Sequence, residues 1–194
     1  MIRWPADLGA LSRAWRRARP FRHVVIDGLL AAADLDRVAA DAQQEPQFLV
    51  EDEIYLHLRS VDPPQRPALR ALRGELSASS AQVSRICGIP VTRADGAAYA
   101  YLEGHYLLPH SDWRESEGRA LAYAYYLSSP ESGGELELFS CTTRKGEIVG
   151  TRAARRIAPR ANRLVLFEVS ATALHRVREV MRGARRSLAG WFYP

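Results

Sequence analysis

Two histidines and one aspartate constrain this chain more than any other feature. His110 and Asp112 flank Ser111, and a further histidine, His175, follows much later in the chain. On a β-strand, residues two apart point to the same face, so His110 and Asp112 can hold one metal ion while Ser111 points away. With His175 they form a two-histidine, one-carboxylate set, which leaves three positions open on an octahedral Fe(II) ion. The pattern therefore predicts redox chemistry at iron.

The end of the chain supplies a candidate anion-binding residue. Residues 185–193 alternate as a strand, with one face made by Arg185, Ser187, Ala189 and Trp191. Because ten residues of straight strand would span about 33 Å, we expect the chain to fold back at Gly183, with His175 and Arg185 on neighbouring strands. A guanidinium binds a carboxylate through two parallel hydrogen bonds, and Ser187 could add a donor. Iron and Arg185 together predict a site for a five-carbon dicarboxylate, 2-oxoglutarate.

The motifs around these residues resemble those of a known family in content and in order. They are Tyr101-Leu102-Glu103-Gly104, Tyr106-Leu107, Tyr125-Tyr126-Leu127, the Gly-Gly-Glu-Leu-Glu-Leu-Phe run at 133–139, Arg163-Leu164-Val165-Leu166-Phe167 and Gly190-Trp191-Phe192. Over residues 97–193, about half the chain, the sequence resembles the Fe(II)- and 2-oxoglutarate-dependent dioxygenases of the prolyl-hydroxylase-like group.

The resemblance implies a role for each matching position. His110, Asp112 and His175 would be the iron ligands, and Arg185 would bind the distal carboxylate of 2-oxoglutarate. Tyr101 and Tyr126 match tyrosines that hydrogen-bond the co-substrate in such enzymes. Neighbouring residues stand as alternatives for three of these positions, namely Tyr99, Tyr125 and Arg186. Arg185 is preferred because both the R-x-S spacing and the six-residue step to Trp191 select it, and for each tyrosine packing inside a barrel is the alternative role.

The activity that the resemblance implies is hydroxylation. With Fe(II), 2-oxoglutarate and O2, such an enzyme hydroxylates an unactivated C–H bond of an amino acid, peptide or carrier-bound small molecule and releases succinate and CO2. One alternative is an AlkB-like nucleic-acid demethylase, but position 191 holds Trp instead of that group's second arginine. Another is a non-catalytic, metal-binding cupin-like module, which would give Arg185 no co-substrate to bind. No G-x-S-x-G motif indicates a hydrolase.

Composition bears on partners and location. Lys145 is the one lysine among 27 basic residues, and the net charge is +5. We attribute this arginine use to coding bias, so it is not evidence for a nucleic-acid partner, and the oligomeric state stays open. Cys87 and Cys141 are expected to be free thiols, and no stretch approaches 18 apolar residues, which predicts a cytoplasmic protein without a membrane span.

The order of elements predicts a single α+β domain over residues 1–194. Helices are expected at 8–17, 31–43 and 67–86 and a strand at 23–26, so that residues 1–93 mainly give helical support. From 94 to 194, short alternating strands predict a jelly roll, a cupin-like double-stranded β-helix that holds the metal site. The polar segment 48–64 is a candidate lid or substrate loop, with a surface hairpin as the alternative. Residues expected near the mouth of the site are Trp113, Arg114 and Arg178.

Overall fold

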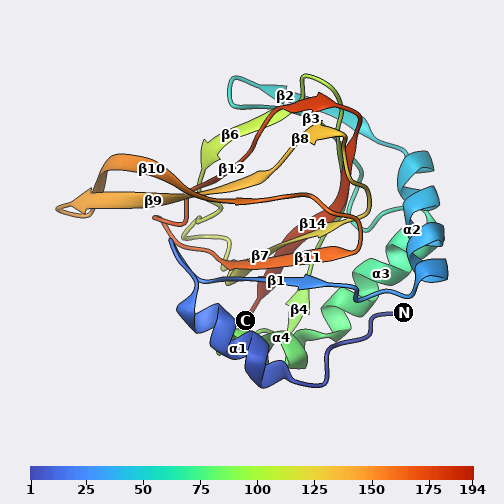
Figure 1. Ribbon diagram of the computed structural model, residues 1–194, viewed down its shortest axis with the longest axis horizontal. Coiled ribbons are helices and arrows are strands. Elements are labelled where there is room, and N and C mark those ends of the chain that lie inside the picture. The colour runs from blue at the N-terminus through green and yellow to red at the C-terminus, as the bar shows by residue number, and fades with distance from the viewer.

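A curled antiparallel sheet of twelve strands forms the centre of the molecule in the computed structural model, which describes residues 1–194 (Figure 1). The helices are α1 Leu8–Arg17, α2 Ala32–Gln44, α3 Pro67–Ala78 and α4 Ser80–Cys87. The strands are β1 His23–Asp27, β2 Phe48–Asp52, β3 Tyr55–Arg59, β4 Arg93–Ala94, β5 Ala97–Tyr101, β6 Tyr106–His110, β7 Leu121–Tyr126, β8 Ser132–Gly133, β9 Leu136–Arg144, β10 Glu147–Ile157, β11 Arg163–Glu168, β12 His175–Val177, β13 Val180–Arg182 and β14 Arg185–Tyr193.

The sheet has two halves that face each other. Its strand order is β1-β11-β7-β14-β5-β3-β6-β12-β9-β10, with β2 added to β3 and β4 added to β14. Strands β1, β11, β7 and β14 form one half, and β6, β12 and β9 belong to the other (Figure 1). Two facing sets of antiparallel strands with helices outside one of them are the predicted α+β double-stranded β-helix. None of the helices has both the length and the hydrophobicity that a membrane-spanning helix requires.

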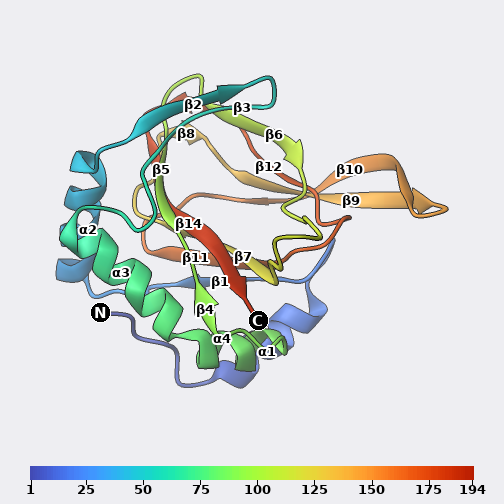
Figure 2. The same ribbon diagram turned by 180° about the vertical axis from the view of Figure 1, so that it is seen from behind.

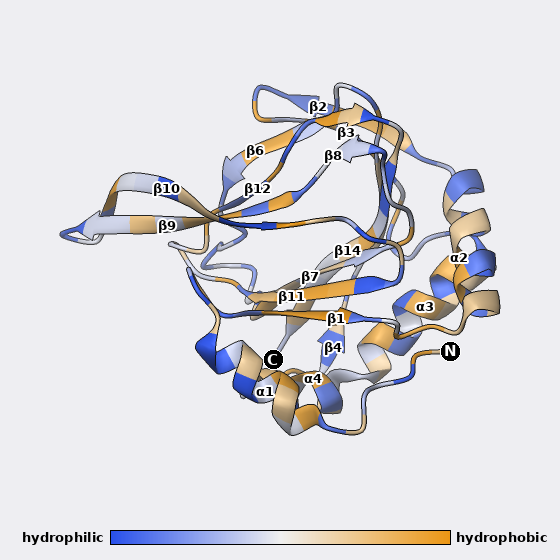
Figure 3. Cartoon of the chain, viewed as in Figure 1, coloured by the Kyte–Doolittle hydropathy of each residue, from blue (hydrophilic) through white to orange (hydrophobic).

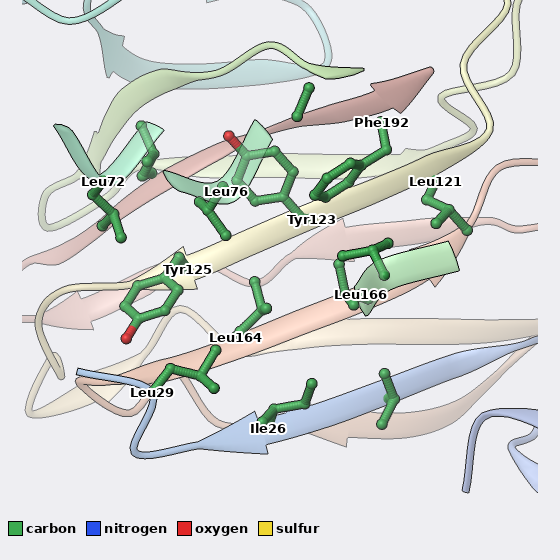
Figure 4. Close-up of a cluster of buried hydrophobic side chains, with 14 of the residues drawn as sticks. Ile26, Leu29, Leu72, Leu76, Leu121, Tyr123, Tyr125, Leu164, Leu166 and Phe192 are labelled. Atoms are coloured by element: carbon green, nitrogen blue, oxygen red, sulfur yellow. The ribbon is translucent and has the colours of Figure 1, made fainter. Parts of the chain in front are cut away.

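The helices cover the outer face of the first half. Seen from behind, α3 and α4 lie on the same side as β4 and the C-terminal end of β14 (Figure 2). Tyr123 and Tyr125 of β7 point toward this layer and pack among leucines such as Leu76 and Leu164 (Figure 4). Hydrophobic residues concentrate in β1 and β11, where both faces are covered (Figure 3). A strand buried on both faces needs apolar residues at successive positions, which explains these continuous runs.

The opposite face of β7 is built from smaller side chains. Ala122, Ala124 and Tyr126 point into the space between the two halves, as Ala189 of β14 does. Ala122 and Ala124, at successive inward positions of β7, leave volume in the barrel that leucines would fill. Both line the cavity between the two halves, and both also pack in a buried cluster with residues such as Leu136 and Phe167.

The helix expected at 67–86 is two helices. The break falls at Ser79, whose hydroxyl donates a hydrogen bond of 2.7 Å to the carbonyl of Glu75 and accepts one of 3.0 Å from the indole of Trp4. A serine that bonds back to the carbonyl four residues earlier competes with the helical pattern and bends the chain. The apolar spacing predicted the buried residues correctly, since Leu69, Leu76 and Ile86 are fully buried.

The expectation that His175 and Arg185 lie on neighbouring strands is wrong. Gly183 makes the predicted turn, with a φ of 87°, but β13 pairs with β8, and β12 pairs with β6 and β9. Strand β14 has β5 and β7 on its two sides. Because both edges of β14 are already hydrogen-bonded, the chain crosses from one half of the barrel to the other at this turn. His175 and Arg185 therefore face each other from opposite halves.

Within residues 48–64, residues 48–59 form a hairpin that belongs to the sheet. Strands β2 and β3 pair along their full length, and β3 also pairs with β5 and β6. The hairpin alternative was thus the better description of its shape, but this hairpin is not a peripheral surface feature. Strand β3 joins the two halves of the barrel, which places its inward side chains in the cavity.

Candidate functional site

The three predicted metal ligands meet at one point. His110 is the last residue of β6, and His175, the first residue of β12, is its register partner, so the two ring centroids lie 4.3 Å apart. Asp112 lies in the loop after β6 and not on the strand as expected. Its two carboxylate oxygens are each 3.5 Å from an Nε2 atom, one of His110 and one of His175. The ligand atoms all lie within 4.8 Å of one another, close enough to share one ion.

Backbone carbonyls set the orientation of both imidazoles. Nδ1–H of His110 donates to the carbonyl of Leu108 at 2.9 Å, and Nδ1–H of His175 donates to that of Ala173 at 3.1 Å. A carbonyl can only accept, so the proton sits on Nδ1 and leaves the Nε2 lone pair free for a metal. The ring of Phe167 packs edge-on against His175 at 4.7 Å and restricts its rotation. This is the outer support that metal-binding histidines usually have.

The loop after β6 is held by Ser111 and Arg119. The hydroxyl of Ser111 donates to the carbonyl of Ser170 at 2.7 Å and accepts from the Trp113 N–H at 3.1 Å. Arg119 donates to the carbonyl of Asp112 at 3.2 Å and stacks on the indole of Trp191 at 3.6 Å. Ser111 thus points away from the triad, as predicted, and fixes the position of Asp112.

The protonation states of the triad suit a cation. Burial lowers the pKa of His175 to about 4, so its imidazole is neutral at pH 7. Burial opposes ionisation of Asp112, but the two facing imidazoles and further hydrogen bonding hold the pKa of this carboxyl well below its usual range. An ionised carboxylate beside a neutral imidazole is the state in which these groups bind a metal.

The triad opens into a cavity of about 340 Å³ between the two halves. A volume of this size lies in the range of pockets that hold small molecules. Its walls include Tyr99 and Tyr101 of β5, and Arg185 and Ser187 of β14. Tyr101 is the register partner of Arg185, and Tyr126 is that of Ser187. The structure thus brings Arg185, Ser187 and Tyr101 to the cavity that the triad faces, with Tyr126 beside them.

Arg185 is a buried cation without an anion. Its side chain is 3% exposed, its Nε atom has no hydrogen-bond partner, and no carboxylate lies within ion-pair distance. Its guanidinium lies over the rings of Tyr101 and Tyr126, 4.8 Å from each centroid. Ser187 Oγ and Tyr126 Oη are also buried and unpaired. A buried, uncompensated charge surrounded by unused donors is unfavourable in a folded protein, and a carboxylate ligand in the cavity would pair with Arg185 and Ser187, which both line it.

The structure distinguishes the predicted site residues from the neighbouring residues that were alternatives to them. Arg186 does not line the cavity, and its backbone N–H donates to Ser128. Tyr125 points to the helix layer, where its hydroxyl donates to Asn162. Tyr99 lines the cavity together with Tyr101, whereas Tyr126 contacts Arg185 without lining the cavity itself.

Two of the three residues expected at the mouth do not line the cavity. Arg114 lines the cavity, but Trp113 is 47% exposed and lies outside it. Arg178 also lies outside, with its Nε atom 4.0 Å from the carboxylate of Glu135. Trp113 and Arg114 follow Asp112 directly in the same loop, and of these two neighbours one is exposed to solvent and the other lines the cavity.

Three cavity residues on β3 were not predicted as site residues. They are Tyr55, His57 and Arg59, which alternate with Leu56 and Leu58. This period of two is the signal that could have identified a strand with one polar, inward face. It was missed because the charged residues before it make the whole segment look like a surface loop.

Burial of two neutral histidines predicts a pH-dependent stability for the metal-free protein. Burial is the main cause that lowers the pKa of both His57 and His175 to about 4, against about 6.5 in an unfolded chain. Between these values the unfolded state binds more protons, so the free energy of unfolding falls as pH is lowered from 7 toward 4. The loss is up to about 3 kcal/mol for each histidine. Denaturant unfolding at pH 7, 6 and 5 measures it, and a flat profile in this range contradicts the burial of these neutral rings.

Comparison with known proteins gives one family. The sequence model of the 2OG-Fe(II) oxygenase superfamily matches residues 96–193, which include the triad and Arg185. Prolyl 3-hydroxylase OGFOD1 of Mus musculus is 29% identical over 188 residues, which cover 90% of this chain and 33% of that protein. The Xenopus laevis protein of the same name is 38% identical over 104 residues, 50% of this chain and 19% of that protein. The chain thus spans a third or less of these relatives.

Solved structures show the same fold. A Pseudomonas putida prolyl-4-hydroxylase has a TM-score of 0.74 at 20% identity and covers 94% of this chain and 98% of its own. A Trichoplax adhaerens prolyl hydroxylase, solved with a peptide fragment of the hypoxia inducible factor oxygen degradation domain, has a TM-score of 0.68 at 17% identity, with 98% and 94% covered. A 2OG-Fe(II) oxygenase family oxidoreductase of Burkholderia pseudomallei has a TM-score of 0.71 at 16% identity, and the match covers 98% of this chain and 92% of its own. These likenesses confirm the predicted double-stranded β-helix.

Proposed function

Because the chain belongs to the 2OG-Fe(II) oxygenase superfamily, we propose that it hydroxylates an unactivated C–H bond, with a prolyl residue of a peptide or protein as its target. Fe(II), 2-oxoglutarate and O2 are the cofactors that this family implies. One observation carries the proposal most directly. A two-histidine, one-carboxylate triad and a buried guanidinium without an anion face the same cavity from opposite halves of the barrel.

The residues that line the cavity fit both Fe(II) and 2-oxoglutarate. Nε2 of His110, Nε2 of His175 and a carboxylate oxygen of Asp112 would hold the iron, since the two imidazoles have Nδ1 occupied by carbonyls. Arg185 would bind the distal carboxylate of 2-oxoglutarate through its unpaired guanidinium. When bound, iron, 2-oxoglutarate and O2 together supply the oxidising chemistry that inserts one oxygen atom into the substrate and releases succinate and CO2.

The protein's own part is orientation and exclusion of water. Ser187 and Tyr126 offer buried, unused hydroxyls beside Arg185. Burial raises the pKa of Tyr101 above its ordinary value, so its phenol keeps its proton and remains a hydrogen-bond donor at neutral pH. A charged co-substrate held by preformed donors needs little rearrangement to reach the reacting geometry.

The surface around the mouth supports a peptide substrate. Its exposed apolar side chains are Ile54 on the β2–β3 hairpin, Leu108 on β6 and Trp113 in the loop after the triad, each at least 40% exposed. Exposed apolar side chains that adjoin one another can mark a binding region. Ile54 lines the cavity, and the Leu108 N–H donates to its carbonyl at 2.8 Å, so these two residues adjoin at a place where an extended chain could bind.

The non-catalytic alternative is less consistent with the cavity. A module that only held a metal would need the triad, but it would leave Arg185, Ser187 and Tyr126 as buried polar groups without partners. Such groups persist in folded proteins when a ligand completes them. We therefore propose a catalytic function instead of a metal-binding module without activity.

A turnover assay tests this function. Purified protein with Fe(II), 2-oxoglutarate and O2 is expected to release succinate in the presence of proline-containing peptides, and the peptide should gain the mass of one oxygen atom. Without oxygen, addition of Fe(II) and 2-oxoglutarate should produce a weak visible charge-transfer band. Protein that holds iron but shows no such band contradicts the proposal.

A further inference from the structure

His57 is a buried polar residue of the cavity that lies outside the region matched by the family. It sits on β3, the strand that joins the two halves of the barrel, whereas the match begins at residue 96. Its side chain lines the cavity and the residue is 7% exposed. Strand β3 therefore brings to the site a titratable group that the triad and Arg185 do not account for.

The imidazole of His57 sits in an aromatic cluster but lacks a polar partner. Its ring is stacked on Tyr101 at 5.2 Å, with planes 27° apart, and lies 5.4 Å from the rings of Tyr55 and Tyr99. Its Nδ1 atom is buried and unpaired. The buried histidines His23 and His175 both use Nδ1 to contact a backbone carbonyl. An apolar ring would fill the same space without the cost of burying an unpaired nitrogen, so the nitrogen is expected to have a ligand.

The charges near His57 are all positive. Burial is the main cause that lowers its pKa to about 4, and Arg59 on the same strand, His105 in the loop after β5 and Arg185 on β14 act in the same direction. Burial also lowers the pKa of His105, so the fixed charges at neutral pH are the two guanidinium groups. From β2 its register partner is the apolar Val50, and from β5 it meets only the neutral tyrosines of the cluster. No carboxylate balances this group of cations. An anion that entered the cavity would reverse the field at the imidazole.

Tyr101 connects His57 to the anion-binding end of the cavity. The guanidinium of Arg185 lies 4.8 Å from the centre of the Tyr101 ring, and the imidazole of His57 lies 5.2 Å from the same ring. Both groups are buried, both line the cavity, and each has an unpaired nitrogen. His57 and Arg185 therefore contact the same tyrosine and line the same cavity, into which a dicarboxylate bound at Arg185 would extend.

We propose that His57 is a further ligand-binding residue of this cavity, which binds a carboxylate of 2-oxoglutarate together with Arg185 and takes up a proton from solvent as it does so. The proposal rests on the proposed function, because it names the same co-substrate. The imidazole is neutral in the empty cavity, where burial and the guanidinium groups of Arg59 and Arg185 disfavour its protonation. The incoming dianion stabilises the protonated ring, so ligand binding and proton binding favour each other.

Calorimetry of 2-oxoglutarate binding to the Fe(II)-loaded protein, without oxygen, tests the proposal. His57→Phe keeps an aromatic ring in the cluster and removes both nitrogens, and it should weaken binding about 10-fold at pH 7, as expected for one lost hydrogen bond to a charged group. His57→Gln keeps a neutral donor and should lose less. The matched control is His105→Gln, because His105 is a nearby histidine with a buried, unpaired Nδ1 that does not line the cavity. Its affinity should stay within about twofold of the wild type.

Proton uptake separates a ligand-binding role from a structural one. Titrations in two buffers of different ionisation enthalpy should show a fraction of a proton taken up by the wild type and by His105→Gln, and more at pH 6 than at pH 7. His57→Phe should show none, and if that variant does not fold, His57→Gln provides the comparison. If the His57 variants bind 2-oxoglutarate with wild-type affinity and take up as many protons as the wild type, the proposal for His57 is wrong and the proposed function still stands. A wild-type protein that holds iron but binds no 2-oxoglutarate overturns both.

Discussion

Replacement of His175 with alanine is expected to weaken Fe(II) binding by at least about 100-fold, because loss of a direct ligand costs more than loss of the groups that support one. His175 is 5% exposed and its Nε2 atom faces Asp112 at 3.5 Å. The remaining pair, His110 and Asp112, comes from one short segment and cannot enclose an ion from two sides. Anaerobic titration with Fe(II), followed by measurement of bound metal, gives the affinity.

A matched control separates loss of a ligand from loss of packing. His23 is also buried, and its Nδ1 contacts a backbone carbonyl in the same way, but it lies on β1 outside the triad. His23→Ala should create a comparable cavity and keep the wild-type affinity for iron. If His175→Ala binds one iron as tightly as His23→Ala does, the triad is not the metal site.

Replacement of Arg185 with methionine is expected to spare iron binding and to weaken 2-oxoglutarate binding by at least about 100-fold. Two hydrogen bonds between a guanidinium and a carboxylate account for a loss of this size. Methionine approximates the length of the arginine stem and removes its charge. Calorimetry with the iron-loaded protein, together with the visible band of the complex, measures both properties.

We also expect an effect of Arg185→Met on stability. In the ligand-free protein Arg185 is buried with no anion, so removal of its charge should leave the free energy of unfolding unchanged or higher. Arg186→Met is the control, since this neighbouring side chain does not line the cavity and should leave 2-oxoglutarate affinity unaltered. Equal affinity for 2-oxoglutarate in Arg185→Met and Arg186→Met would contradict the assignment of Arg185.

Local patterns in the sequence predicted several elements with accurate bounds. The helix at 8–17 and the strand at 185–193 match α1 and β14, and the helix expected at 31–43 differs from α2 by one residue at each end. Each prediction depended on spacing of apolar residues or on Pro and Gly nearby, which act within a few residues. The prediction of one long helix was wrong at Ser79, whose hydroxyl bonds to the Glu75 carbonyl and also accepts from Trp4, a residue 75 positions away.

Side-chain direction in the site was partly accessible from the sequence. The alternation along β14 correctly placed Arg185, Ser187, Ala189 and Trp191 on the cavity face, because a strand has a strict period of two. The same rule could not choose between Tyr125 and Tyr126, since every residue of β7 is buried and neither face is polar. Helices cover one face of β7 and the cavity lies on the other, and this arrangement depends on chain segments far from β7.

The amino-acid sequence by itself determined which chemical groups are available and which family of folds they belong to, because ligand spacing and strand periodicity are local properties. The tertiary structure decided which strands are neighbours and therefore which groups meet. It placed β14 between β5 and β7, across the barrel from His175, and brought β3 with His57 into the cavity. The physical reason is that strand pairing and burial depend on hydrogen bonds and packing between distant segments, which no local pattern of residues records.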